Sequence, residues 1–272
     1  MMIPGDSIPD QMVISLKGQG RVTKSFVMML EMLAQANFSR PLYMSTTVGA
    51  SNYGNLYKHF MQEGIAWRIT PFTFPDNQPM NTVCDTEKMY DNMMNKYRYG
   101  NLKHPDLYID EATMRMCYTH RRWFANLITN LVYEGKYDKA LKALEKCATE
   151  IPAYNIPHSV DCASYELATA YVACGKPEKA AEILADLEKV SSEYVKWYFS
   201  LSNVYFANAY KDCFRDIYTI RRIQALYQEM ADLGTSKQSV YENKVKQLDK
   251  DIEIFANAFE RKCNEADIVP QL

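Results

Sequence analysis

The stretch Gly18-Gln19-Gly20-Arg21-Val22-Thr23-Lys24-Ser25 has residue types that could hold a phosphate. It lies between a predicted strand and a predicted helix, and it ends in Lys24-Ser25 as a phosphate-binding loop does. Thr23, however, occupies the position of the glycine before the lysine, where the backbone must wrap the phosphate. No clear apolar strand ending in aspartate follows to hold magnesium. We therefore expect no nucleotide and no other cofactor in this chain.

Other residue types that often do chemistry are not arranged for it. The acidic pair in Asp249-Lys250-Asp251 lies in the middle of a predicted helix, where residues two apart do not converge on one metal ion. The seven cysteines include no CxxC pair. The histidines, which have no paired metal-ligand spacing, are His59, His104, His120 and His158. We expect no metal site and no catalytic residue.

Arginine, tyrosine, amide and charged side chains gather near the ends of predicted elements in the first part of the chain. Because loops at strand ends hold ligands in α/β proteins, these side chains are candidates for a binding site. One alternative is that their charges tie the α/β part to the helices that follow, and another is that they form the polar site of an enzyme. The candidates are Arg40, Tyr43, Arg68, Asp91, Asn92 and Lys96.

The first third of the sequence predicts a mixed α/β module. Apolar residues alternate over residues 12–16 and 65–69 as in half-buried strands, and residues 42–48 are rich in β-forming types. Helical spacing runs over residues 26–37, and a short helix is expected over residues 56–62. The order strand, helix, strand, helix, strand favours a small sheet whose parallel neighbours are joined by crossovers.

The rest of the chain is expected to be helical, with one helix near residues 85–97 and others from about residue 110 to the end. A hexad occurs twice, as Gly135-Lys136-Tyr137-Asp138-Lys139-Ala140 and as Gly175-Lys176-Pro177-Glu178-Lys179-Ala180. The glycine ends one helix in the left-handed conformation, and the alanine lets the next helix approach its partner closely. Two such units predict a helical repeat array, which usually binds other molecules.

The spacing around the first hexad is that of a tetratricopeptide repeat. The large, small, large and proline positions of that repeat fall on Leu127, Ala140, Leu144 and Pro152. The hexads are 40 residues apart rather than 34, which predicts a longer connection near residues 156–161. A longer apolar hairpin, residues 223–259, follows and suits the terminal cap that such an array requires.

We therefore predict an α+β, mostly α fold, in which a small α/β module precedes a tetratricopeptide-like helical array. The expected boundaries are residues 1–80 for the module, 81–109 for a connecting helix and loop, and 110–272 for the array. The net charge of −2 gives no reason to expect nucleic acid as a partner. No stretch approaches the roughly 20 apolar residues of a membrane span.

Several short motifs are shared with a known family. They are Arg40-Pro41-Leu42-Tyr43, Glu63-Gly64-Ile65-Ala66-Trp67-Arg68, Met89-Tyr90-Asp91-Asn92-Met93-Met94-Asn95-Lys96, Tyr99-Gly100-Asn101-Leu102, Arg115-Met116 and Glu134-Gly135-Lys136. Together they resemble the C-terminal soluble part of a Bacteroidetes multi-pass membrane-protein family of unknown function. That family is similar to glycosyltransferases of the protein O-mannosyltransferase type, which use lipid-linked sugars. On this resemblance, Arg115 joins the candidates for binding.

The resemblance implies that the catalytic acids of the parent protein belong to membrane-proximal loops outside this chain, so no catalytic residue is carried over. It also implies a place on the periplasmic face of the inner membrane, where the membrane half of the parent protein would be one partner. The cysteines, which mostly lie in apolar helix patterns, favour a reducing compartment instead. Apart from the resemblance, the expected location is the cytoplasm.

The expected function is that of a non-catalytic accessory domain of a membrane glycosyltransferase-like protein, which binds a polypeptide acceptor or partner through its helical array. Two alternatives stay open. One is a free-standing repeat scaffold for protein–protein interaction, and the other is a soluble enzyme with a polar site at the junction of the two modules.

Overall fold

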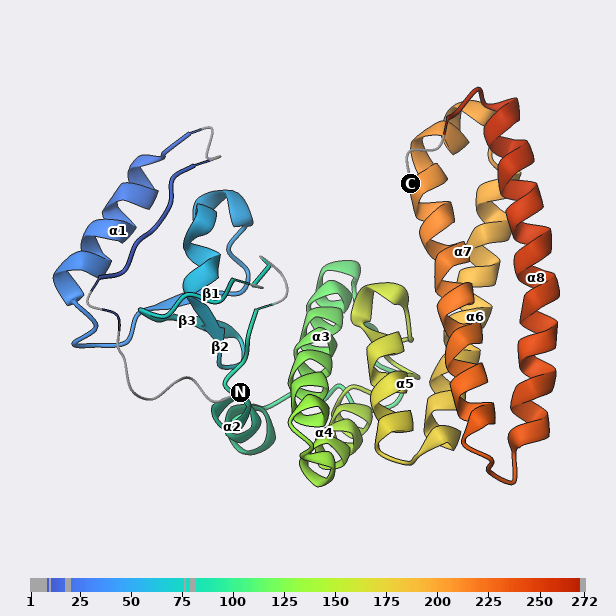
Figure 1. Cartoon of the computed structure of the whole chain (residues 1–272), viewed down its shortest axis with the longest axis horizontal. Helices are drawn as coiled ribbons and strands as arrows, with labels where there is room; N and C mark the ends of the chain where they lie inside the picture. The colour runs from blue at the N-terminus through green and yellow to red at the C-terminus, as the bar shows by residue number, and fades with distance from the viewer. Residues whose placement is uncertain (1–8, 10, 18–20, 76, 79–81, 270–272) are drawn as a thin grey trace. The chain divides into compact units, whose positions relative to one another are not determined.

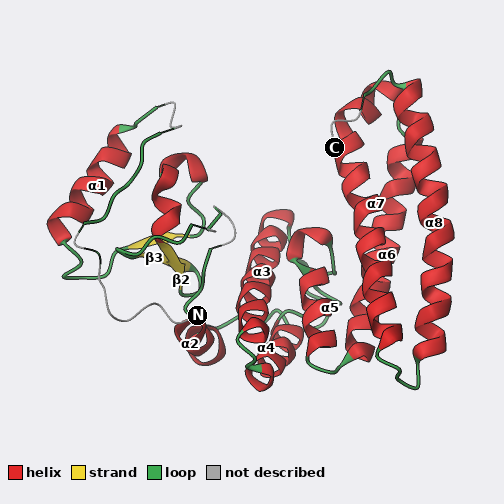
Figure 2. Ribbon diagram, in the orientation of Figure 1, coloured by secondary structure: helices red, strands yellow, loops and turns green. Residues whose placement is uncertain are grey.

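The computed structural model describes residues 9, 11–17, 21–75, 77–78 and 82–269, which divide into two compact units. The first unit comprises Met1–Arg98 with Tyr133–Lys136, and the second comprises Tyr99–Val132 and Tyr137–Leu272. The first unit contains a small sheet and the second is a helical array, which is the fold class predicted from the sequence (Figures 1 and 2). No described helix is both long and apolar enough to cross a membrane.

In the described part of the first unit, three short strands form one antiparallel sheet in the order β1-β3-β2. The strands are β1 (Tyr43–Ser45), β2 (Phe60–Gln62) and β3 (Ala66–Ile69). The predicted parallel arrangement is wrong, because β1 pairs antiparallel with β3. Residues 60–62, which the sequence predicts to be helical, form β2 instead, and the short link of residues 63–65 permits only an antiparallel hairpin between β2 and β3. The pairing of β1 with β3 places Tyr43 opposite Arg68, so two predicted site residues are neighbours.

Two predicted elements of the first unit differ from the structure. Residues 12–16 form no strand, although Met12 and Ile14 pack on the core while Val13 is 76% exposed. Their alternation therefore reflects burial on one side of an extended segment. The helix predicted over residues 56–62 is a 3-10 helix, Gly54–His59, that ends where β2 begins. All three residues of β2 are buried, so that strand has no alternation to reveal it.

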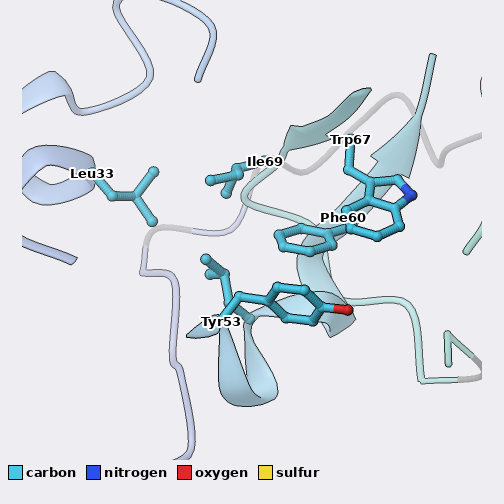
Figure 3. Packing of buried hydrophobic residues seen from close by; sticks show 6 residues of the cluster. Leu33, Tyr53, Phe60, Trp67 and Ile69 are labelled. Atoms are coloured by element: carbon cyan, nitrogen blue, oxygen red, sulfur yellow. The ribbon is translucent and has the colours of Figure 1, made fainter. Parts of the chain in front are cut away.

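The core of the first unit is an aromatic cluster that the strands share with helix α1 (Lys24–Ala36). The rings of Phe60 and Trp67 stack with their centroids 5.2 Å apart, and the ring of Tyr53 meets both edge-on (Figure 3). Leu33 of α1 belongs to the same cluster. Burial of each such side chain stabilises the fold by about 1.5–3 kcal/mol before the chain entropy is counted, so the cluster holds α1 against the strands.

Helix α2 (Thr86–Asp91) begins after Asp85, whose carboxylate accepts the backbone N–H of Lys88 at 3.1 Å. The helix continues without a break into one π-helical stretch, Asn92–Lys96. The prediction of a helix near residues 85–97 is confirmed. A π-helical turn is a rare local geometry that is often found at functional sites.

The described part of the second unit is built from antiparallel helices. They are α3 (Glu111–Tyr133), α4 (Tyr137–Glu150), α5 (Ser164–Ala173), α6 (Pro177–Ser200), α7 (Asn203–Asp232) and α8 (Gln238–Glu265). Between α3 and α4 the φ angle of Gly135 is 73°, and between α5 and α6 that of Gly175 is 71°. Ala140 and Ala180, the last residues of the two hexads, are fully buried.

The connection between α4 and α5 is long, as the 40-residue spacing of the hexads predicts, and a buried arginine organises it. Arg121 of α3 is 1% exposed, and its guanidinium donates hydrogen bonds to the carbonyl oxygens of Ile151 (2.9 Å), Ile156 (2.7 Å) and Pro157 (3.1 Å). A buried guanidinium must have its N–H groups satisfied, so these bonds fix the course of the connection.

Helices α7 and α8 form the long C-terminal hairpin that the apolar spacing predicts. Phe206 of α7 packs against Phe259 of α8 with their ring centroids 6.0 Å apart. The hairpin is also tied to the array, because Lys244 of α8 pairs with Glu188 of α6 at 2.8 Å. The second unit therefore has a packed helical layer at its end, as a capped array requires.

Candidate functional site

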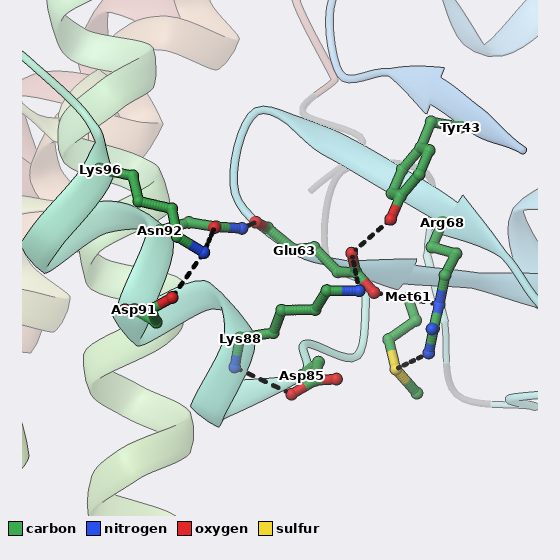
Figure 4. Close-up of polar contacts among 9 residues, drawn as sticks. All are labelled: Tyr43, Met61, Glu63, Arg68, Asp85, Lys88, Asp91, Asn92 and Lys96. Atoms are coloured by element: carbon green, nitrogen blue, oxygen red, sulfur yellow. Dashed lines mark hydrogen bonds and ion pairs between the residues drawn. The ribbon is translucent and has the colours of Figure 1, made fainter. Parts of the chain in front are cut away.

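A buried glutamate is the centre of the polar site in the first unit. Glu63, in the turn after β2, is 4% exposed, and its carboxylate accepts a hydrogen bond from the hydroxyl of Tyr43 at 2.9 Å. The same carboxylate pairs with Arg68 Nε at 3.0 Å and with Lys88 Nζ at 2.9 Å (Figure 4). Two cations and one hydroxyl thus compensate a carboxylate that has lost most of its water.

The backbone of the β2–β3 turn is fixed from two sides. The side-chain amide of Asn92 donates to the Glu63 carbonyl oxygen at 2.7 Å, and the Ile65 N–H donates to the hydroxyl of Tyr97 at 3.2 Å. Gly64 between them has a φ angle of 123°, and a Cβ there would collide with that hydroxyl. Only glycine suits this position, so the turn holds the Glu63 carboxylate in one place relative to α2.

The structure brings some of the predicted site residues together and leaves others apart. Tyr43, Arg68 and Asn92 all contact Glu63. Asp91 and Lys96 instead pair with each other at 2.5 Å on the exposed side of their helix. A hydrogen bond from Asn95 and the pairing with Lys96 lower the pKa of the Asp91 carboxyl. These residues form a local surface network that reaches the cluster through Asn92, whose side-chain oxygen accepts a hydrogen bond from Lys96 Nζ at 3.2 Å.

Arg115 belongs to the second unit and does not take part in the Glu63 cluster. It pairs with Glu111, one turn earlier on α3, at 2.5 Å, and both side chains are more than 70% exposed. Exposed pairs of this kind contribute little free energy.

Two members of the cluster, Glu63 and Lys88, are absent from the sequence-based set of candidates. One sequence feature could have identified Glu63 as a site residue: it stands directly before a glycine, between two short β-forming runs. Its burial follows from the hairpin, which the prediction of parallel strands did not contain. The hydrogen bond from Lys88 to Glu63 raises the pKa of the Lys88 ammonium group.

A cavity of about 920 Å³ lies beside the cluster. Its cationic lining comes from Arg40, Arg68 and Lys88, and Tyr43 also contributes. Its apolar lining includes Leu30 and Leu33 of α1, Met12 and Ile14 of the extended segment, Ile69 of β3 and Phe72. We call this space the cationic cavity.

The glycines of the phosphate-loop-like stretch, Gly18 and Gly20, lie outside the described residues, as does Gln19. Beside them, Thr23 is the N-cap of α1, and its hydroxyl accepts the Phe26 N–H at 3.3 Å. The threonine in the place of a glycine therefore has a helix-capping role.

The second unit has a groove of about 710 Å³ between the α4–α5 connection and the long helix α6. We call it the aromatic groove. Its aromatic lining residues are Tyr118 of α3 and Tyr194, Trp197 and Tyr198 of α6. Tyr194 is 49% exposed and Trp197 is 52% exposed, so both rings present large apolar surfaces to solvent. The sequence pattern alone does not distinguish these residues from the other aromatic residues of the chain.

The charges that line the aromatic groove are mainly acidic. Asp161 and Glu193 are exposed carboxylates, and Arg215 lies 3.8 Å from Asp161. Asp216 is 3% exposed, and burial raises the pKa of its carboxyl to about 6 although the neighbouring Arg215 acts in the opposite direction. At neutral pH the lining thus carries more negative than positive charge.

His158 closes one side of the aromatic groove in its neutral form. Burial, with a further contribution from the charge of Arg121, lowers the pKa of its imidazole to about 4. Its Nδ1 lies 2.8 Å from the hydroxyl of Ser164 at the start of α5. Arg121 donates a hydrogen bond to the carbonyl oxygen of Pro157, the residue before His158, so the groove wall depends on the same buried arginine as the α4–α5 connection.

Replacing the buried carboxylate tests the Glu63 cluster. We expect Glu63→Gln to lower the free energy of unfolding by about 2–3 kcal/mol, because Arg68 and Lys88 then face each other without a counter-charge. Glu31→Gln, on the exposed face of α1, should change it by less than about 0.5 kcal/mol. Urea denaturation of the two variants and the parent chain measures both values. Equal stability of the Glu63 variant and the parent would show that the ion cluster contributes nothing net.

The raised pKa of Asp216 predicts a pH dependence of stability. The folded state keeps the Asp216 proton up to a pH of about 6, whereas the unfolded chain loses it near 3.8. The contribution of this group to stability is therefore fully present below pH 3.8 and is lost as the pH rises through 6. When the pH is raised from 4 to 7, the free energy of unfolding of Asp216→Asn should therefore increase by about 2 kcal/mol relative to that of the parent chain.

Denaturant titrations at several pH values test this expectation. Asp232→Asn, in which the replaced carboxylate is exposed and lies at the end of the same helix, is the matched control and should show no such trend. A parallel pH dependence of the Asp216 variant and the parent would contradict the assignment.

The comparisons with known proteins match both units in part. Residues 1–88 are similar to a family described as TMEM260-associated domain 2, and residues 131–192 are similar to the tetratricopeptide repeat. The repeat predicted from the two hexads is thus confirmed, while neither description names a glycosyltransferase or a bacterial group. No curated protein and no solved structure matches the chain significantly.

Proposed function

We propose that the chain is a polypeptide-binding accessory module, and that the aromatic groove of its helical array takes the polypeptide. The observation that carries this proposal is the groove itself, where two half-exposed aromatic rings of α6 stand beside acidic side chains. Tetratricopeptide-like arrays typically bind proteins or peptides on extended surfaces. Aromatic residues dominate the energetics of such interfaces because each buries a large area at small entropic cost.

The groove also indicates which polypeptides fit. Tyr194 and Trp197 offer flat apolar faces to proline or aliphatic side chains, and they can hold a cation over the ring. Asp161 and Glu193 at the same groove favour a lysine or arginine next to that apolar residue. We therefore expect an extended segment that combines an apolar residue with a basic one.

A phage-displayed library of linear peptides tests this function directly on the full chain. Enriched peptides should contain lysine or arginine beside proline or aliphatic residues. Their affinity, measured by calorimetry on synthetic copies, should fall at least tenfold for Tyr194→Ala. Tyr205→Ala is the matched control, because that tyrosine of α7 is 68% exposed and lies outside the groove.

Two outcomes would count against the groove as the binding site. One is a set of peptides without basic residues that bind equally well to Glu193→Gln. The other is an equal loss of affinity in the Tyr194 and Tyr205 variants, which would indicate a different or nonspecific surface.

The parent protein is the second part of the proposal. The match of residues 1–88 to a TMEM260-associated domain supports a module that works beside a membrane protein. In a parent protein that is a glycosyltransferase, we place the catalytic residues outside this chain. We expect the native reading frame to encode membrane spans upstream of this chain. Sequencing the source locus measures this, and a frame without any such spans would leave the peptide-binding role but remove the accessory one.

A further inference from the structure

We propose that the cationic cavity of the first unit binds a small organic anion, in which a carboxylate or phosphate group is carried on an apolar chain. This site is separate in chemistry from the aromatic groove, and it does not depend on the peptide-binding function.

The charge around the cavity carries the first step of this inference. Arg68 and Lys88 share one carboxylate, that of Glu63, so the three groups together keep one positive charge. Arg40 also lines the cavity, and it has no ion-pair or hydrogen-bond partner within the described part of the chain. No acidic residue is among the described lining residues. Among the described residues, about two positive charges without a counter-charge therefore face one space, and they attract an anion.

The type of cation indicates the type of anion. A guanidinium presents its N–H groups as a planar fork that matches the paired oxygens of a carboxylate or a phosphate. Arg40 is free to make such contacts, and Lys88, which is 43% exposed, can add a point charge. Glu63 holds Arg68 and Lys88 in position before any ligand arrives, which reduces the entropy cost of binding.

The apolar wall and the size of the cavity carry the next step. Leu30 and Leu33 of α1 line the space together with Ile69 of the strand that carries Arg68, and Ile14 and Phe72 extend the apolar lining. A volume of about 920 Å³ is in the range of pockets that hold drug-sized ligands and is far larger than an inorganic phosphate needs. Burial of an apolar chain against this wall would strengthen binding about fourfold for each CH₂ group. The ligand should therefore be amphiphilic.

Calorimetric titration of the full chain tests this proposal with four probes at concentrations below micelle formation. The probes are octanoate, octyl phosphate, inorganic phosphate and the uncharged octyl glucoside. We expect binding of octanoate, octyl phosphate or both, at least tenfold weaker binding of inorganic phosphate, and no detectable binding of octyl glucoside. The two octyl anions distinguish a carboxylate ligand from a phosphate ester.

Two variants place the binding in the cavity. Arg40→Gln removes the unpaired cation at an exposed position and should weaken binding of the octyl anions at least tenfold, whereas Arg21→Gln, at another exposed arginine of the same unit, should leave it unchanged. Ala34→Trp fills the cavity from an exposed position on α1 and should abolish binding. Circular dichroism checks that each variant is folded. Equal binding of octyl glucoside, no binding of either octyl anion, or unchanged binding in the Ala34 variant would overturn the proposal.

Discussion

The cost of removing a charge from water is the constraint on which both units depend. Each unit contains an almost completely buried charged side chain that is held by several partners, Glu63 in the first and Arg121 in the second. A buried charge must find partners or it destabilises the fold by several kcal/mol, and in both units those partners come from segments far apart in the sequence. Glu63 joins β1, β3 and α2, and Arg121 joins α3 to the α4–α5 connection. The less regular segments of the fold are therefore fixed by these two groups.

The same constraint explains why each candidate site lies where it does. Glu63 needs cationic partners, and those partners, Arg68 and Lys88, line the cationic cavity. The compensation of one buried charge therefore leaves positive charge beside a space that is partly lined by apolar side chains. Arg121 needs carbonyl oxygens, and the connection that supplies them forms one wall of the aromatic groove. A structural requirement and a candidate binding surface thus share residues, so variants that test binding must be chosen among side chains outside the buried networks.

How much of this the sequence predicts depends on the range of the interactions. The array follows from local information, since Gly135 and Gly175 adopt the left-handed conformation and the apolar periodicity of each helix is intrinsic to that helix. The sheet does not, because Phe60 to Gln62 are buried on both faces and the alternation of residues 12–16 belongs to no ladder. Tyr43, Arg68 and Asn92 are found by their position at element ends, whereas Glu63 becomes identifiable only when the hairpin brings its partners together.

The aromatic groove arises where the second unit departs from a regular repeat. A tetratricopeptide array of strict period would have no long connection between α4 and α5, and its helices would not reach the 24 residues of α6. The extra length of α6 carries Glu193, Tyr194 and Trp197, and the extra connection carries His158 and Asp161. Both departures contribute to the same groove, although neither is needed to stack helices. Local departures from regular repeat geometry are expected at functional sites, because the shape of a binding surface there takes precedence over regular packing.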